Sequence, residues 1–144
     1  MIRLSKPFAA LFSLGLAMVA LAGCSSSAIS LDGTRWRLTG WTLSSLDPAD
    51  FTITAQFADG RISGESGVNN YSGTFRIGPG DAFSVGAVAG TRMAGPEPAM
   101  RAESAFLTLL GEAGSFRKAD GQLTLFDGKG NESLRFSLVD RAHP

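Results

Sequence analysis

Short runs of β-prone residues recur from Leu31 onward, and glycine, aspartate, asparagine or proline separates each run from the next. A spacing of about 8 to 12 residues between such turn signals is typical of a β-sandwich or a β-barrel. Within the runs apolar and polar residues alternate, as around Trp36 and Leu38, which directs one face of a strand inward. The sequence therefore predicts strands at 34–41, 51–57, 61–66, 71–77, 83–91, 115–119, 122–126 and 133–139.

Asp-Gly pairs mark several of the joints between these runs. Asp59-Gly60 and Asp120-Gly121 suit a two-residue hairpin turn of type I′, because both central positions of that turn need a positive φ. We therefore expect most neighbouring strands to be antiparallel.

One segment departs from the β pattern. After two prolines at 96 and 98, apolar residues from Ala99 to Leu110 recur with helical spacing. Proline suits the first turn of a helix, and Gly111 or Gly114 suits its end. We expect one amphipathic helix that covers an open end or face of the sheet. The predicted fold is mainly β (α+β): a small antiparallel β-barrel-like domain of about eight strands with one capping α-helix, over residues 31–140.

Glu103 lies on the inward side of this helix. An unpaired buried carboxylate is costly, so we expect Glu103 to have a partner, and Arg92 is one candidate.

The chain lacks the side chains that common enzyme mechanisms need. Its one histidine, His143, is the second-last residue, which excludes a serine or cysteine nucleophile with a histidine base and also a histidine metal site. One cysteine forms neither an intramolecular disulfide nor a thiolate zinc site. The 13 basic and 13 acidic residues balance, which gives no basic surface for nucleic acid. We expect no enzyme, no metal, no cofactor and no nucleic-acid partner.

A glycine- and asparagine-rich segment lies between two predicted strands. It contains Gly67, Asn69, Asn70, Tyr71 and Gly73. One interpretation is a tight turn whose asparagine side chains hydrogen-bond nearby backbone groups. The other is a polar recognition loop, and we favour the turn.

The N-terminus is arranged as a signal peptide. Two basic residues precede an apolar run over 8–22, which is shorter than the roughly 20 residues of a membrane-spanning helix. Leu21-Ala22-Gly23-Cys24 resembles the lipobox of bacterial lipoproteins. The resemblance implies that residues 1–23 are removed, that Cys24 is acylated, and that 24–30 form a serine-rich tether. The alternative is an ordinary secretory signal with an incidental cysteine.

The lipobox resemblance also implies a location. Ser25, which is not aspartate, permits sorting onward, so we expect the protein in the cell envelope, lipid-anchored to the outer membrane and facing the periplasm. Removal of 1–23 takes away Arg3 and Lys6 but no acid, so the mature domain has two more acids than bases. The acyl chains on Cys24, rather than surface charge, must therefore hold it at the membrane.

Several segments together resemble the META domain family of HslJ-like bacterial lipoproteins. They are Leu31–Leu38, Ser63-Gly64, Gly67–Gly73, Thr91–Ala94, Glu103 with Phe106, and Leu123–Leu125, in the order of the family and across about 31–139. The resemblance implies a small barrel capped by a helix, export, and links to envelope stress and drug tolerance. It implies no catalytic residues, and it makes Gly67, Asn69, Asn70, Tyr71, Gly73, Thr91, Met93 and Glu103 turn and packing positions.

The chain departs from this family at two positions. Many members have cysteine where this chain has Val68 and Gly95, which implies a disulfide in those relatives that is absent here. Such a crosslink contributes about 2 to 4 kcal/mol.

Two functions fit these observations. The first is a non-enzymatic envelope lipoprotein that binds an envelope protein or component and contributes to stress or drug tolerance. The second is a lipocalin-like carrier of a small apolar ligand inside the barrel. A filled core would argue against the carrier, whose cavity would be lined by Phe51, Phe57, Phe75, Phe83, Phe126 and Phe136.

Overall fold

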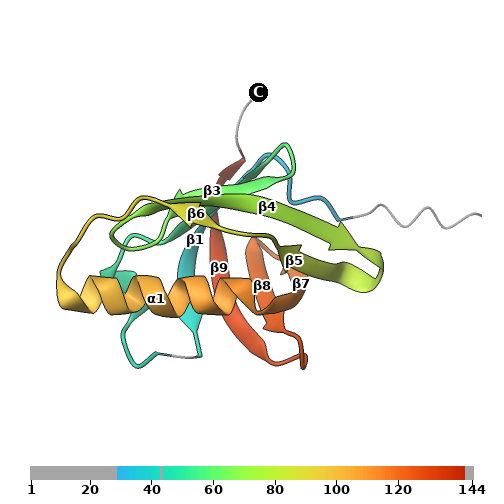
Figure 1. Cartoon of the computed structure of the whole chain (residues 1–144). Coiled ribbons are helices and arrows are strands. Elements are labelled where there is room, and N and C mark those ends of the chain that lie inside the picture. Colours follow the sequence, from blue (N-terminus) through green and yellow to red (C-terminus); the bar gives the residue numbers. More distant parts are fainter. Residues whose placement is uncertain (1–28, 43, 142–144) are drawn as a thin grey trace, which may run out of the picture.

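The computed structural model describes residues 29–42 and 44–141 (Figure 1). The signal peptide, Cys24, the tether up to residue 28 and His143 lie outside these residues. The described elements are β1 (Thr34–Trp41), η1 (Pro48–Asp50), β2 (Thr54–Ala58), β3 (Arg61–Glu65), β4 (Asn70–Gly78), η2 (Pro79–Asp81), β5 (Ala82–Val85), β6 (Ala89–Gly90), α1 (Glu97–Gly111), β7 (Ala113–Ala119), β8 (Gln122–Asp127) and β9 (Glu132–Arg141).

Eight of the strands form a closed antiparallel barrel. Their order is β3-β2-β1-β9-β8-β7-β5-β4, and the pairing of β3 with β4 closes the ring. The junction between β5 and β7 consists of one residue pair, Ala82 with Ser115. β6 is an extra strand beside β4. The prediction of a mainly β barrel with one helix is confirmed.

The predicted single strand at 83–91 is wrong, because the chain forms β5 and β6 with a break between them. Phe75 is in register with Val85, whereas Ser72 is in register with Ala89. The segment from 85 to 89 is therefore one residue longer than the segment from 72 to 75 of β4 that it faces. Gly86 donates its N–H to Thr74 O at 2.8 Å within this break. The predicted strand at 51–57 also begins later, at Thr54.

The Asp-Gly turns have the expected geometry. Asp59 and Gly60 have φ values of 52° and 72°, and Asp120 and Gly121 have values of 51° and 73°. Positive φ at both central residues is the mark of a type I′ turn. These turns join β2 to β3 and β7 to β8, and both pairs are antiparallel.

Aromatic side chains fill the barrel. The rings of Phe57 and Phe75 lie 4.9 Å apart between centroids. Phe83 lies 6.2 Å from each of them, stacked on Phe75 and edge-to-face with Phe57. A second group joins Phe106 to Phe136 at 6.4 Å. These rings contact one another instead of bordering a space, which argues against the carrier hypothesis.

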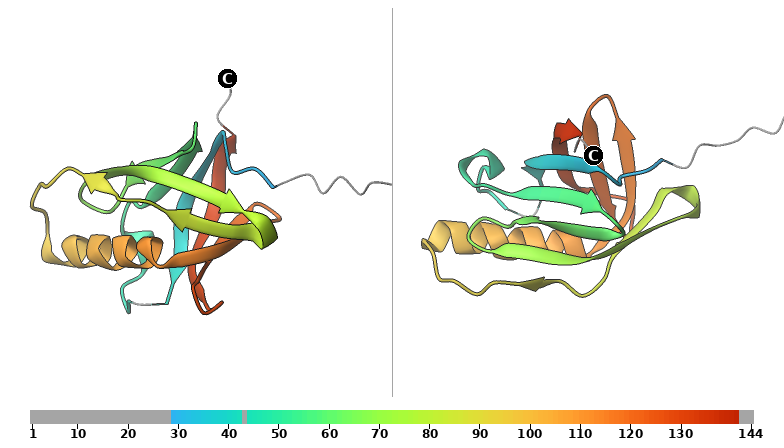
Figure 2. Two further views of the ribbon diagram at one scale, coloured as in Figure 1. Left: turned by 45° about the vertical axis from the view of Figure 1, so that its right-hand side comes forward. Right: turned by 90° about the horizontal axis from the view of Figure 1, so that it is seen from above.

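The helix α1 lies along one side of the barrel (Figure 2) and contacts β5 and β9. Its buried face consists of Ala102, Glu103, Phe106, Leu109 and Leu110. In the ranges 29–42 and 44–141, no helix has both the length and the apolar character needed to cross a membrane.

Candidate functional site

The motif residues come together where three segments meet. These are the loop 66–69 before β4, the helix α1, and residues 86–96, which contain β6 and connect β5 to α1 and which we call the strap. Asn69, Thr91, Met93 and Glu103 form one hydrogen-bond network there.

Asn69 is the centre of the network and is 5% exposed. Its Oδ1 accepts hydrogen bonds from Thr91 Oγ1 at 2.9 Å and from the N–H of Met93 at 2.7 Å. Its Nδ2 donates to the carbonyl of Met93 at 3.1 Å and to Glu103 Oε1 at 2.8 Å. All four hydrogen-bonding positions of the amide are used. The side chain therefore ties the strap to both the loop and the helix.

Glu103 is a buried carboxylate held by neutral donors. Its Oε2 accepts from Ser66 Oγ at 2.7 Å, from the N–H of Asn69 at 2.8 Å and from the N–H of Val68 at 3.3 Å. Burial raises the pKa of the Glu103 carboxyl, but the hydrogen bonds from the Asn69 and Ser66 side chains and from the two backbone N–H groups outweigh burial. Its pKa therefore lies below the ordinary value, and the group is ionised at neutral pH.

The expectation that Arg92 is the partner of Glu103 is wrong. Arg92 is exposed and forms no ion pair within the described ranges. Ser66 takes part in its place, and sequence reasoning missed it. The only signal of Ser66 in the sequence is its position three residues before Asn69, which is weak. In the structure the N–H of Ser66 donates to the carbonyl of Asn69 at 2.8 Å, which closes the turn.

Gly67 allows the loop to lie against α1. Its φ is 116°, and a Cβ there would lie 3.2 Å from the carbonyl oxygen of Ala99. Gly73 of β4 is similarly crowded, because its Cβ would lie 3.2 Å from the carbonyl oxygen of Ala87 on the strap. Both glycines therefore sit at close approaches between segments.

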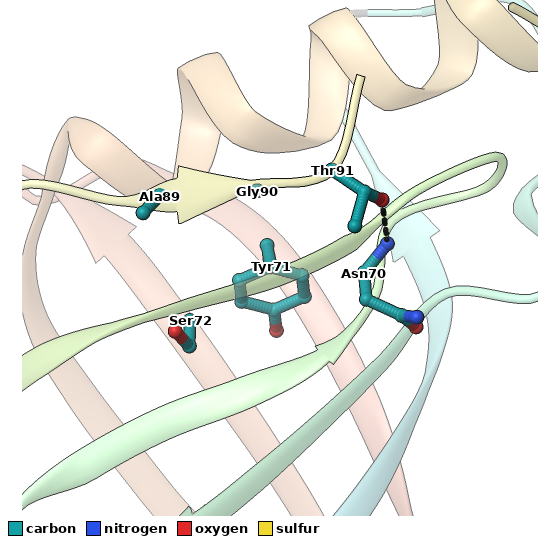
Figure 3. Close-up of a pocket in the computed structure, with 6 residues that line it drawn as sticks. All are labelled: Asn70, Tyr71, Ser72, Ala89, Gly90 and Thr91. Atoms are coloured by element: carbon teal, nitrogen blue, oxygen red, sulfur yellow. Dashed lines mark hydrogen bonds between the residues drawn. The ribbon is translucent and has the colours of Figure 1, made fainter. Parts of the chain in front are cut away.

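Tyr71 faces the barrel interior, whereas the side chain of Asn70 is exposed. The hydroxyl of Tyr71 donates to the carbonyl of Thr54 at 2.7 Å, and its ring lies 5.4 Å from that of Phe106. Burial raises the pKa of Tyr71 above its ordinary value. Figure 3 shows the neighbouring contact, in which the N–H of Asn70 donates to Thr91 Oγ1 at 3.1 Å.

Two hollows flank the network. The first, hollow A, measures about 340 Å³ and lies between the strap and α1, with Val88, Gly90, Arg92 and Leu107 among its lining residues. The second, hollow B, measures about 270 Å³ and is lined by Asn69, Thr91, Arg92, Met93, Ala94, Met100 and Glu103. Both hollows border Asn69, Thr91, Arg92 and Glu103.

A third, shallow depression of about 400 Å³ lies at the backbone of β4 and β6 (Figure 3). It is lined by Asn70, Tyr71, Ser72, Ala89, Gly90 and Thr91.

In the part of the chain that the structure describes, no group of three or more histidine, cysteine, aspartate or glutamate side chains is placed to hold a metal ion. The first two hollows are both bordered by the buried, ionised carboxylate of Glu103.

Val68 and Gly95 lie in contact across the loop and the strap. A Cβ built on Gly95 would lie 3.4 Å from Val68 Cβ and 2.8 Å from its two methyl carbons. The first distance is close to the Cβ–Cβ separation of about 3.5 to 4.5 Å in disulfides. In this chain the valine methyl groups occupy that space.

Comparisons with known proteins identify the family and the fold. The family model of the META domain matches residues 29–140. The comparison with curated proteins found no match. The NMR structure of a protein from Burkholderia xenovorans is similar, with a TM-score of 0.64 and 30% identity over 77% of this chain and 85% of that chain.

Two further structures share the fold. The NMR structure of a second protein has a TM-score of 0.60 and 23% identity, over 76% of this chain and 92% of that chain. The crystal structure of a DUF4847 family protein from Bacteroides vulgatus has a TM-score of 0.53 and 14% identity, over 74% of this chain and 93% of that chain.

Proposed function

This chain belongs to the META domain family, and from that premise we propose that it is a lipid-anchored, non-enzymatic protein of the bacterial cell envelope that binds an envelope protein or component. The META domain and the small barrel are consistent with a non-enzymatic protein. The observation that carries the proposal is the position of Cys24, which ends a lipobox-like segment seven residues before Leu31, the first buried residue of the domain. Seven residues reach at most about 25 Å, so an anchor at Cys24 would hold the barrel close to the membrane.

The state of Glu103 argues against a role as a general acid or base. A general acid or base works best when its pKa lies near the ambient pH. Four hydrogen bonds engage the Glu103 carboxylate, and its pKa lies below the ordinary value. Its chemistry is that of a fixed anchor for the loop and the strap.

The cellular part of the proposal rests on sequence. Ser25 after the lipobox-like cysteine supports sorting to the outer membrane, with the domain in the periplasm. The family resemblance supports a contribution to envelope stress or drug tolerance.

Replacement of the cysteine tests the anchor. In Cys24→Ala the full-length chain should leave the membrane fraction, and its intact mass should lack any acyl increment. Ser26→Ala is the matched control, because it keeps the lipobox-like segment, and it should stay membrane-bound and acylated. Membrane attachment of Cys24→Ala without a mass increment would refute the anchor.

Crosslinking in intact envelopes tests the binding role. The wild-type chain should give a reproducible crosslinked product with another envelope component. A chain that remains uncrosslinked at every reagent length would contradict the proposal.

A further inference from the structure

The two methionines of the domain lie at one place on its surface. The chain has four methionines, and Met1 and Met18 belong to the expected signal peptide. The other two are Met93, on the strap, and Met100, in the first turns of α1. Both line hollow B, which therefore has one thioether from the strap and one from the helix.

The two thioethers differ in exposure. Met93 is 57% exposed, whereas Met100 is half-buried. Methionine is more often a core residue, where its flexible side chain fills irregular gaps. An oxidant must contact the sulfur to convert a methionine to its sulfoxide, so exposure favours the reaction. Met93 is therefore the methionine of the two that a dissolved oxidant reaches more readily.

The position of Met93 does not depend on its side chain. Its N–H donates to Asn69 Oδ1 at 2.7 Å, and its carbonyl accepts from Asn69 Nδ2 at 3.1 Å. In the part of the chain that the structure describes, the buried apolar cluster and the half-buried side chains packed against it do not include Met93. Backbone hydrogen bonds, rather than apolar packing, thus hold this residue in place.

This arrangement separates the chemistry of the thioether from the stability of the fold. Oxidation makes a methionine polar, and it disrupts a protein when that methionine belongs to the core. At Met93 the added oxygen would lie at the surface, and both hydrogen bonds to Asn69 would remain. The reaction would change one wall of hollow B from an apolar group to a hydrogen-bond acceptor and leave the barrel intact.

We propose that Met93 is a site of reversible oxidation, at which an oxidant of the peroxide class converts the thioether to the sulfoxide while the domain stays folded. One oxygen atom passes from the peroxide to Sδ: an S–O bond forms, the O–O bond breaks, and water leaves when the oxidant is hydrogen peroxide. The sulfur loses two electrons and the peroxide gains them. A dithiol reverses the step, because it takes up the oxygen as water and becomes a disulfide, which is the reaction of methionine sulfoxide reductases.

Timed oxidation measures the reactivity of each methionine. The full-length protein, purified from cell envelopes without denaturation, is treated with excess hydrogen peroxide, and peptide mass spectrometry follows the gain of one oxygen atom at each methionine. The gain at Met93 should be about fivefold faster, or more, than the gain at Met100. Equal rates at the two residues, or a faster gain at Met100, would overturn the inference.

Thermal melting of the oxidised protein tests whether the fold is unaffected. The Met100→Leu variant is used, so that Met93 is the one methionine left in the ranges 29–42 and 44–141. After oxidation it should melt within about 2 °C of its untreated form. The pair of methionine sulfoxide reductases, one for each epimer, should then restore its original mass without unfolding. A larger shift, or a sulfoxide that is reduced only after unfolding, would refute the proposal.

Matched variants assign the reaction and its tolerance to Met93. Met93→Leu should lose the rapid mass gain, whereas Met100→Leu should keep it. Met93→Gln places a polar amide where the sulfoxide would lie and should melt as the wild type does, whereas Leu110→Gln, at a fully buried position of α1, should melt much lower. Destabilisation by Met93→Gln would contradict the inference. These outcomes are independent of the membrane-release and crosslinking tests of the proposed function.

Discussion

The side-chain amide of Asn69 pairs with the backbone of Met93 as a neighbouring strand would. Met93 donates its N–H to Oδ1 at 2.7 Å and accepts from Nδ2 at 3.1 Å through its carbonyl. One side chain thus takes the place of a peptide group, and it holds the strap where β6 has already ended.

Asn69→Ala should destabilise the protein strongly. It removes four hydrogen bonds and leaves groups of Met93 and Glu103 without partners, which should cost about 2 to 4 kcal/mol. Urea unfolding measures the change. Asn70→Ala is the control, since that side chain is exposed, and it should shift the unfolding free energy by less than about 0.5 kcal/mol. Equal effects of the two variants would contradict this role for Asn69.

Glu103 should make stability depend on pH. Its pKa is lower in the folded state than in the unfolded state, so its contribution is present above the unfolded value of about 4.3 and is lost as the pH falls through the folded value. Unfolding free energies at pH 7 and pH 3 should therefore differ less in Glu103→Gln than in the wild type. Glu65→Gln, at an exposed residue of β3, should retain the wild-type difference. An unchanged difference in Glu103→Gln would be evidence against this linkage.

A disulfide should form between positions 68 and 95. In a Cys24→Ser background, Val68→Cys with Gly95→Cys should oxidise spontaneously and raise the unfolding free energy by about 2 to 4 kcal/mol over its reduced form. Non-reducing mass analysis and thermal melts with and without reductant measure this. Gly95→Cys alone should be destabilised, because its Cβ would lie 2.8 Å from the methyl groups of Val68. A double variant that stays reduced in air would show that the two backbones lie farther apart.

Native mass spectrometry of the protein from envelope extract should show the acylated polypeptide and no small ligand. The reason is the packing of Phe57, Phe75 and Phe83, whose ring centroids lie 4.9 to 6.2 Å apart inside the barrel. A reproducible added mass that disappears on unfolding would revive the carrier function.

Local sequence patterns were sufficient for most of the fold. Alternation at Trp36 and Leu38 located β1, and the Asp-Gly pairs located two hairpins. The break between β5 and β6 was missed because it depends on the register against β4, which no local pattern carries.

The site was harder to predict for the same reason. The sequence drew attention to Asn69 and Glu103 separately, but Glu103 depends on Ser66, which lies 37 residues away in the chain. A small hydroxyl side chain in a loop gives no signal of such a contact. Arg92 was the expected partner on charge alone, and the buried carboxylate is satisfied by uncharged donors.

The single residue pair between β5 and β7 has a consequence for motion. Every other junction of the barrel has at least three paired residues, whereas this one has a single pair. The rings of Phe83 and Phe116 lie 6.1 Å apart across it. Local opening starts where the fewest hydrogen bonds must break. This junction is therefore where we expect the barrel to open first. Transient separation of β5 and β7 would expose the aromatic core next to the strap.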